Sequence, residues 1–509
     1  MNIPQRTMSL RKYAVAAAFV VAALLLVLSV KGQPGKPLHF QYDLDPATGG
    51  PFESSNSRSR YALVESLVDN HTVYLSPKLK LFADPDINKR DNRYISVFLP
   101  GISFLAIPLY ILGKAVGLPQ FVTYLFNPLI ALGNMFLISM LSRRFGAGKY
   151  AGLLSGFLFL FATNGLAYTQ TLTQHQFTLS LVLLALYAIL GKSTFKKNVL
   201  MGILIGVALI IDIPNVFILA PFVLYLFFQN LVIKTTLRRV VVKVKWTLVG
   251  LVIGTLPFLM VFMGYNYLTT HSLFTVAQSV GYGTYSAPGK TASPVIPASI
   301  YDTKLAIDSR ALLQGLSVLL ISNERSIFYY NAIVLIGILG LVLVIKGRKT
   351  DEYLAQTILG SLIVTVLLYA MFHDPWGGWS FGPRYLIPVT GLLTVFAGSA
   401  LTRYKRNFLF IVLFAGIFLY STSINVAGVL TTNNIPPKQE ADRLLTPIPY
   451  TYAYNFRLIQ DNTTSSLVYN AVFKKAMNVQ TFFILYTSII VLMGLTLYAL
   501  MLRHDDTNL

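Results

Sequence analysis

Long apolar runs recur along this chain at a length that suits one kind of fold. Most are close to the about 18 to 22 residues that a helix needs to cross roughly 30 Å of hydrocarbon. With 54% hydrophobic and only 12% charged residues, a water-soluble fold could not cover so much apolar surface. The sequence therefore predicts an all-α, polytopic membrane protein of about 12 transmembrane helices, at 13–30, 121–141, 150–168, 177–190, 200–211, 216–233, 248–268, 327–345, 355–372, 386–401, 408–427 and 482–502.

The placement of the basic residues predicts an orientation. If the N-terminus lies in the cytosol, 21 of the 41 Lys and Arg fall in short cytosolic loops, and 16 of the 20 acidic residues fall on the opposite side. Cytosolic loops are enriched in Lys and Arg, so the net charge of +21 is an orientation signal and not a nucleic-acid patch. We expect both termini in the cytosol, and no nucleic-acid partner.

Segment 95–116 is apolar enough to span a membrane, yet we expect a helix or re-entrant hairpin at the outer surface. Pro100, Gly101 and Pro108 disfavour a continuous helix. Counting it as a span would also move every later basic cluster to the outside. The N-terminal run lacks a small-residue cleavage pattern and is interpreted as an uncleaved anchor. The sequence has no cysteine, which excludes disulfides and thiolate metal sites.

These spans divide the chain into seven expected regions with three large external loops. They are 1–30, the N-terminal cytosolic segment and first span; 31–119, the first external loop with juxtamembrane helices; 120–268, transmembrane helices; 269–326, the second external loop; 327–427, transmembrane helices with a short external motif loop at 373–385; 428–480, the third external loop; and 481–509, the last span and cytosolic tail.

The first external loop carries two Asp-x-Asp pairs, Asp43-Leu44-Asp45 and Asp84-Pro85-Asp86. Carboxylates one residue apart can face one divalent cation or one pair of hydroxyl groups. Asp before Pro is also common turn chemistry, so each pair alone is about as well explained by a turn. Residues 59–68 have the pattern of an amphipathic helix, which would pack at the membrane surface.

The motif loop His373-Asp374-Pro375-Trp376-Gly377-Gly378-Trp379-Ser380-Phe381-Gly382-Pro383-Arg384-Tyr385 is the most distinctive stretch. Trp and Tyr at a helix end are typical interface anchors. That role does not account for three glycines and an external arginine. Glycines let a backbone approach a ligand, and a guanidinium can hold a phosphate with two hydrogen bonds. We therefore favour a lipid-phosphate site at Arg384 over an arginine that only reaches the interface.

These features together resemble the GT-C superfamily of membrane glycosyltransferases, and in particular its family-39-like members that use dolichyl- or polyprenyl-phosphate sugars. The matching parts are the acidic first loop, the Arg-Tyr-Ala-Leu-Val-Glu-Ser-Leu helix at 60–67, the surface segment at 94–110, the stretches at 127–129 and 142–146, and the Trp-Gly-Gly-x-x-x-Gly-Pro-Arg-Tyr pattern at 376–385. The last 80 or so residues match no pattern of the family.

The resemblance implies an inverting transfer in which a carboxylate of the first loop deprotonates the acceptor hydroxyl. Only Glu53 is acidic just before the Arg-Tyr helix, where the family has its base. We expect Glu53 as the base and Asp84 and Asp86 as ligands of a metal or of the acceptor. The alternatives are that Asp84 or Asp86 is the base, or that activity is lost. The expected substrate-binding residues are Arg58, Arg60, His175, Trp376, Trp379, Arg384 and Tyr385.

The function expected from the sequence is transfer of a hexosyl or pentosyl group from a polyprenyl-phosphate donor to a glycan, lipid or protein acceptor, at the extracytoplasmic face of the plasma membrane. A divalent cation is a candidate cofactor. A lipid or polysaccharide transporter, or flippase, is the main alternative, which the large loops and the lack of a visible repeat disfavour. A polysaccharide polymerase or ligase is harder to separate, because it would act on the same donor at the same face.

Overall fold

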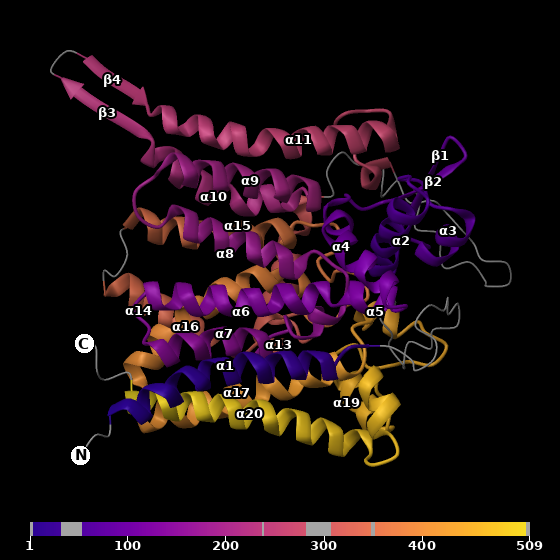
Figure 1. Ribbon diagram of the computed structural model, residues 1–509, viewed down its shortest axis with the longest axis vertical. Helices are drawn as coiled ribbons and strands as arrows, with labels where there is room; N and C mark the ends of the chain where they lie inside the picture. The colour runs from indigo at the N-terminus through magenta and orange to yellow at the C-terminus, as the bar shows by residue number, and fades with distance from the viewer. Residues whose placement is uncertain (1–3, 32–52, 237–238, 281–306, 348–351, 505–509) are drawn as a thin grey trace.

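The computed structural model describes residues 4–31, 53–236, 239–280, 307–347 and 352–504. The first Asp-x-Asp pair, Asp43 and Asp45, lies outside these residues. The described chain is a bundle of long helices with shorter elements at its two ends (Figure 1). The long helices are α1 (Pro4–Leu28), α6 (Phe126–Arg144), α7 (Lys149–Ala162), α8 (His175–Ile189), α9 (Phe195–Ile211), α10 (Pro214–Gln229), α11 (Val249–Thr270), α14 (Val334–Lys346), α15 (Glu352–Ala370), α16 (Ile387–Tyr404), α17 (Phe408–Leu430) and α20 (Val479–His504).

Each apolar run predicted from the sequence is helical over most of its length. Within the described residues, six helices are long and apolar enough to cross a membrane, and seven shorter apolar helices accompany them. The chain is therefore a multi-pass membrane protein. The number of spans and their orientation stay predictions. Burial varies widely among the helices, since the hydrophobic part of α11 is 17% buried whereas every residue from Tyr150 to Ala162 of α7 is buried.

The two ends of the bundle differ. One end carries the start of α1, the end of α20 and a protruding hairpin of β3 (Leu231–Thr236) and β4 (Arg239–Val244) (Figure 1). The other end, which we call the loop end, carries α2 (Ser55–Asp69), α3 (Pro77–Ala83), α4 (Gly101–Ala115), α5 (Pro119–Tyr124), α19 (Ala453–Gln460) and a hairpin of β1 (Ile87–Arg90) and β2 (Arg93–Ser96). The start of α1 and the end of α20 therefore lie at the same end of the bundle, and the side of the membrane on which the termini lie stays a prediction.

The remaining elements are short. They are α12 (Leu312–Leu316), α13 (Ile327–Tyr330) and α18 (Lys438–Ala441), the 3-10 turns η1 (Ala167–Gln170), η2 (Trp246–Leu248), η3 (Ala277–Val280), η5 (Ser309–Ala311) and η7 (Arg384–Leu386), and the π-helical turns η6 (Ser317–Ile321) and η8 (Tyr469–Phe473).

The two antiparallel hairpins were not expected in an all-α fold. In the first, Ile87 pairs with Ser96 and Arg90 with Arg93, and the turn residues Asp91 and Asn92 have φ of 48° and 58°. Asp and Asn tolerate this left-handed conformation better than other non-glycine residues, which suits a two-residue turn. The second hairpin is rich in valine, a good strand former. The sequence was interpreted there as the end of a span and a basic loop.

Two predicted spans are shorter than their apolar runs. In the run at 150–168 the α-helix ends at Ala162, and Thr163 to Gln174 continue as buried backbone that is irregular except for the 3-10 turn η1. Asn127 of α6 donates through Nδ2 to the carbonyl oxygens of Thr171 and Thr173, the latter at 3.1 Å. Irregular backbone at such depth requires partners of this kind within the protein. The run at 327–345 is broken between α13 and α14, where Asn331 accepts a hydrogen bond from the backbone of Asn164.

The predicted surface segments form helices that pack on each other. Segment 95–116 becomes β2 and α4, and the helix expected at 59–68 is α2. Tyr61 of α2 meets Tyr110 of α4 edge to face at 5.7 Å, and the Tyr110 hydroxyl donates to Asp69. Residues Tyr61 to Val64 are buried, so protein rather than lipid covers this face of α2.

Candidate functional site

The site is built around Asp86, which follows α3 and directly precedes β1. Its carboxylate accepts a hydrogen bond from the Ser55 hydroxyl at 2.7 Å, and its carbonyl accepts one from the Ser59 hydroxyl at 2.7 Å. Both serines lie on α2, which therefore fixes the carboxylate from one side. Burial raises the pKa of Asp86 above the ordinary aspartate value, while Ser55 and nearby arginines oppose that rise.

Three arginines surround this carboxylate: Arg58, Arg60 and Arg384 each interact with it electrostatically. Arg60 is 1% exposed, and its guanidinium donates to the side-chain oxygen of Gln174 at 2.9 Å and lies 4.0 Å from the centre of the Phe98 ring. Burial lowers the pKa of Arg60 to about 10, so the group still carries its charge at neutral pH. A buried, fixed positive charge of this kind is well placed to meet an anionic ligand.

A second carboxylate, Asp212, faces the same arginines from the end of α9. Gln174 donates to its carboxylate at 3.0 Å, and both Arg60 and Arg384 interact with it electrostatically. Because Gln174 binds Arg60 and Asp212 together, α2, α8 and α9 meet at one point. Asp212 is not among the site residues expected from the sequence. A charged residue at the end of an apolar run was the available signal.

His175 and Tyr385 close the site beside Arg384. The His175 ring is 3% exposed and contacts Tyr168 and Tyr385 edge to face, at 5.5 and 6.0 Å. Within the described part of the chain, His175 Nε2 and Arg384 Nε are buried without a hydrogen-bond partner. Buried polar atoms are nearly always paired, so these two mark a place where a ligand or water would bind. Tyr385 stacks on Tyr369 at 4.4 Å.

The predicted binding residues Arg58 and Asp84 lie at the edge of the site. Arg58 donates to the carbonyl oxygen of Asp84 at 2.7 Å, which ties α2 to the end of α3. Burial raises the pKa of the Asp84 carboxyl. Its Oδ1 atom is buried without a partner among the described residues. The predicted pair Asp84 and Asp86 is therefore at the site, with Asp86 facing the arginines.

Glu53 lies in a different environment from Asp86. Its carboxylate binds the Lys31 ammonium at 2.5 Å, the Thr432 hydroxyl at 2.8 Å and the Asn433 backbone N–H at 2.9 Å. The side chains of Lys31 and Glu53 are 0% and 4% exposed. The carboxylate thus joins the end of α1 to the segment after α17, and its oxygens are occupied by protein.

The motif loop at 373–385 presents Arg384 through a tight backbone path. Gly377 has φ of +74°, and a Cβ there would lie 2.9 Å from Arg384 Nε. Gly382 has φ of +62°, and a Cβ would lie 2.8 Å from the Tyr330 ring. Any larger residue would be strained and would displace one of these neighbours. The glycines therefore allow the loop to pack against Arg384 and Tyr330.

Both tryptophans of the loop bind carboxylates. Trp376 Nε1 donates to Glu324 at 2.9 Å, and Trp379 Nε1 donates to Glu440 at 2.5 Å. The Glu324 carboxylate also accepts from the backbone N–H of Lys438 at 2.9 Å. The motif loop is therefore held by hydrogen bonds to Glu324 and to Glu440, in addition to any contact that its tryptophans make with the membrane interface.

Arg325, like Asp212, was not singled out from the sequence. It is 0% exposed and donates to the carbonyl oxygens of Trp376, Glu324 and Ile435 and to the Ser380 hydroxyl, at 2.8 to 3.2 Å. It thus links the motif loop to the segment after α17, the start of the expected third external loop. An arginine in a long loop carried no visible signal, because most of its partners are distant in sequence.

A metal site cannot be identified from the described residues. No group of three or more His, Asp or Glu side chains there has the arrangement to hold a metal ion. Asp86 and Asp212 instead face arginines. The site therefore contains a pair of carboxylates, an imidazole and the fixed positive charges of the arginines.

The bundle shares its fold with a GT-C glycosyltransferase, which is the fold that the sequence resemblance predicted. It is similar over 98% of its length to apo ArnT from Cupriavidus metallidurans, with 13% identity, a TM-score of 0.51 and 78% of that chain covered. At this identity the likeness establishes the fold alone.

Two further structures match at lower TM-scores. ArnT from the same organism bound to undecaprenyl phosphate matches at 0.47, with 14% identity and 98% and 77% of the two chains covered. The oligosaccharyltransferase AglB from Archaeoglobus fulgidus, in complex with an inhibitory peptide and a dolichol-phosphate, matches at 0.40, with 13% identity and 85% and 57% covered. No protein-family model matches the sequence, and no curated protein matches it significantly.

Proposed function

We propose that this protein transfers a sugar from a polyprenyl-phosphate donor to an acceptor at the extracytoplasmic face of the cell membrane. The observation that carries the proposal is the convergence of Asp86 and Asp212 with Arg60, Arg384 and His175 at the loop end. A carboxylate held beside fixed positive charges suits a reaction that removes a hydroxyl proton while a phosphate leaves.

Asp86 is the base in this proposal. Its carboxylate accepts a side-chain hydrogen bond from Ser55, whereas the Glu53 carboxylate is bound by Lys31, Thr432 and Asn433. A base needs a free oxygen within about 2.6 to 3.2 Å of the proton that it removes. The geometry therefore favours the alternative in which the role belongs to the second Asp-x-Asp pair, with Glu53 as an anchor of the fold.

Arg384 and Arg60 bind the donor phosphate, with His175 and Tyr385 beside it. Arg384 Nε and His175 Nε2 are both buried without a hydrogen-bond partner among the described residues, and a phosphate oxygen could accept from either if the imidazole presents its N–H. Phosphate leaves without strong acid catalysis because the arginines stabilise the charge that develops on it. The positive charge at the loop end also fits an anionic lipid headgroup near the membrane surface.

The test is release of undecaprenyl phosphate by the purified full chain. The protein would be mixed with undecaprenyl-phosphate-linked hexose and pentose donors and with a membrane extract that supplies acceptors. We expect Asp86→Asn to reduce release by about 10²- to 10⁴-fold. The matched control is Asp69→Asn, since Asp69 is also on the loop end but pairs with Lys114 at 2.7 Å. Equal loss in both variants, or donor consumption without a glycosylated product, would contradict the proposal.

A further inference from the structure

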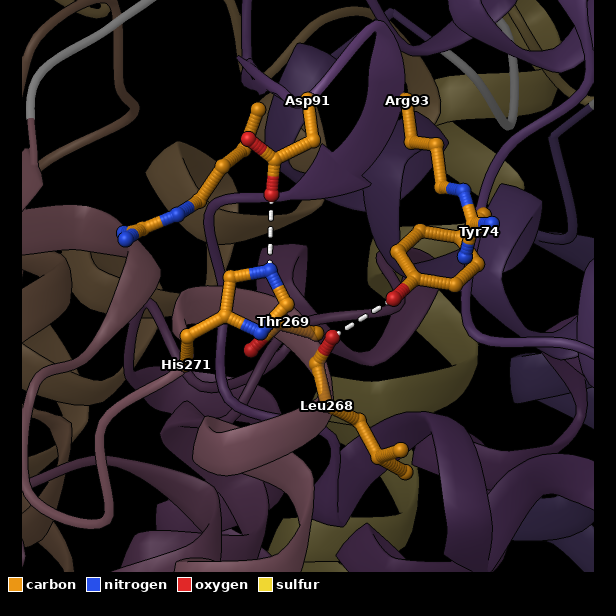
Figure 2. Close-up of a pocket in the computed structure, with 7 residues that line it drawn as sticks. Tyr74, Asp91, Arg93, Leu268, Thr269 and His271 are labelled. Carbon is orange, nitrogen blue, oxygen red and sulfur yellow. Dashed lines mark hydrogen bonds and ion pairs between the residues drawn. The ribbon is translucent and has the colours of Figure 1, made fainter.

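A separate pocket lies where the β1–β2 turn meets the end of α11 (Figure 2). Its volume is about 220 Å³, and three segments line it. Tyr74 follows α2, Arg90, Asp91 and Arg93 come from the hairpin, and Leu268 and His271 come from the end of α11. We call it the α11 pocket. It is smaller than the about 300 to 1,000 Å³ of drug-sized sites, so it suits one charged group with little attached.

Three contacts hold these segments together. The Tyr74 hydroxyl donates to the carbonyl oxygen of Leu268 at 2.7 Å, and Arg93 lies 4.6 Å from the centre of the Tyr74 ring. His271 Nε2 lies 2.7 Å from a carboxylate oxygen of Asp91. Figure 2 shows the Asp91 carboxylate directed at the His271 ring, while Arg93 extends over Tyr74. The single carboxylate of the pocket is therefore engaged by the histidine.

The pocket has surplus positive charge. In the part of the chain that the structure describes, neither Arg90 nor Arg93 forms an ion pair with a carboxylate. A guanidinium presents a planar fork of N–H groups that matches the oxygens of a phosphate or a carboxylate.

The plainest structural reason for these charges is the end of α11, since a helix C-terminus attracts cations. That end already has partners, because Tyr74 binds the Leu268 carbonyl and His271 lies at the cap. Arg90 and Arg93 are therefore not required to stabilise the end of α11. They also oppose the orientation preference if the loop end is external, because basic residues concentrate on the cytosolic side. An anionic ligand would account for the positive charge of these two arginines.

Strand β1 connects the pocket to the candidate base. Asp86 directly precedes β1, and Arg90 is its last residue. Four residues of strand at about 3.3 Å each separate the two by ~13 Å. An anionic group in the pocket would thus lie a short distance from the hydroxyl that Asp86 deprotonates.

From this geometry we infer that the α11 pocket binds a phosphate or carboxylate group of the molecule that approaches Asp86. Under the proposed function, on which this reading rests, that molecule is the acceptor, and its substrate class is an anionic glycan or lipid. Exposed apolar side chains at Tyr267, Leu268 and Phe274 place lipid within reach, so the group could belong to a lipid or to a soluble molecule.

The test uses the purified full chain and two kinds of probe. Saturation-transfer NMR would compare glucose 6-phosphate with glucose. Native mass spectrometry would compare the chain in nanodiscs containing phosphatidic acid with nanodiscs of phosphatidylcholine alone. The variant is Arg90→Gln combined with Arg93→Gln. The control is Arg310→Gln, because Arg310 is 91% exposed, outside the pocket, and pairs with Asp308. Thermal unfolding would verify that both variants fold.

We expect the wild type to bind at least one phosphate probe about tenfold more tightly than its neutral counterpart. The double variant loses this preference and Arg310→Gln keeps it. Binding of glucose 6-phosphate supports a soluble source, and binding of phosphatidic acid alone supports a lipid. The inference is overturned if neither phosphate probe is preferred, or if the double variant binds as the wild type does. Asp86→Asn should keep the preference while transfer is lost, which separates this inference from the proposed function.

Discussion

The guanidinium of Arg325 donates a hydrogen bond of 2.8 Å to the carbonyl oxygen of Ile435, which lies 110 positions later in the chain. The same side chain binds the Trp376 carbonyl in the motif loop. Arg325 thus fixes the loop that presents Arg384 against the segment whose Thr432 and Asn433 hold Glu53. The start of the expected third external loop is therefore joined to the motif loop through Arg325.

This relationship predicts that Arg325 positions the phosphate site. Arg325→Ala should weaken binding of undecaprenyl phosphate by at least tenfold, because several backbone carbonyls lose a buried donor. Arg325→Lys should recover part of the affinity. Combining Arg325→Lys with Arg384→Ala should add little to the loss from Arg384→Ala alone, as measured by a double-mutant cycle. Fully additive losses would show that Arg325 supports the fold without acting through Arg384.

Arg384 should not tolerate lysine. An ammonium cannot form the planar two-point contact of a guanidinium, so Arg384→Lys should lose undecaprenyl phosphate affinity almost as severely as Arg384→Ala. Titration of the purified chain in nanodiscs measures both. Arg457→Lys is the control, since Arg457 on α19 is 55% exposed and pairs with Asp461. Full affinity in Arg384→Lys would mean that the arginine only reaches toward the interface.

Glu53 and Asp86 should respond differently to loss of charge. Glu53→Gln should lower the unfolding temperature, because Lys31 would remain buried without its carboxylate, and a broken buried pair costs about 3 to 5 kcal/mol. Asp86→Asn should leave stability unchanged or raise it, because a desolvated charge is removed. Thermal unfolding at pH 7, with transfer measured in parallel, distinguishes them. If Glu53→Gln is stable and inactive while Asp86→Asn is active, the base is Glu53.

The raised pKa of Asp86 predicts that the rate of sugar transfer falls at low pH as this carboxylate becomes protonated. Because burial favours its protonated form, the folded carboxyl keeps its proton to a higher pH than the about 3.9 of a free aspartate. Transfer should therefore decline on the acid side at a pH above that value. Between the two pKa values the folded state binds more protons than the unfolded state, so the contribution of Asp86 to stability falls as pH rises. Asp86→Asn should abolish this component of the pH dependence of unfolding.

The helices and the motifs could be predicted from the sequence, whereas most contacts between them could not. The apolar runs identified the long helices, since length and hydropathy are local properties. The hairpin turn at Asp91 and Asn92 gave only a weak signal. The roles of Glu53 and Asp86 could not be separated, because Lys31, Thr432 and Asn433 come from distant segments. Asp212 was missed for the same reason, as its partner Gln174 lies 38 residues away.

The most direct measurement is the identity of the lipid that co-purifies with the protein. Mass spectrometry of the wild type, isolated from its own membranes in mild detergent, should detect a polyprenyl phosphate. Asp86→Asn should accumulate the same lipid with its sugar attached, because binding persists and transfer stops, and Arg384→Ala should carry little of either. Absence of polyprenyl phosphate from the wild type, or equal amounts in the wild type and Arg384→Ala, would contradict the account.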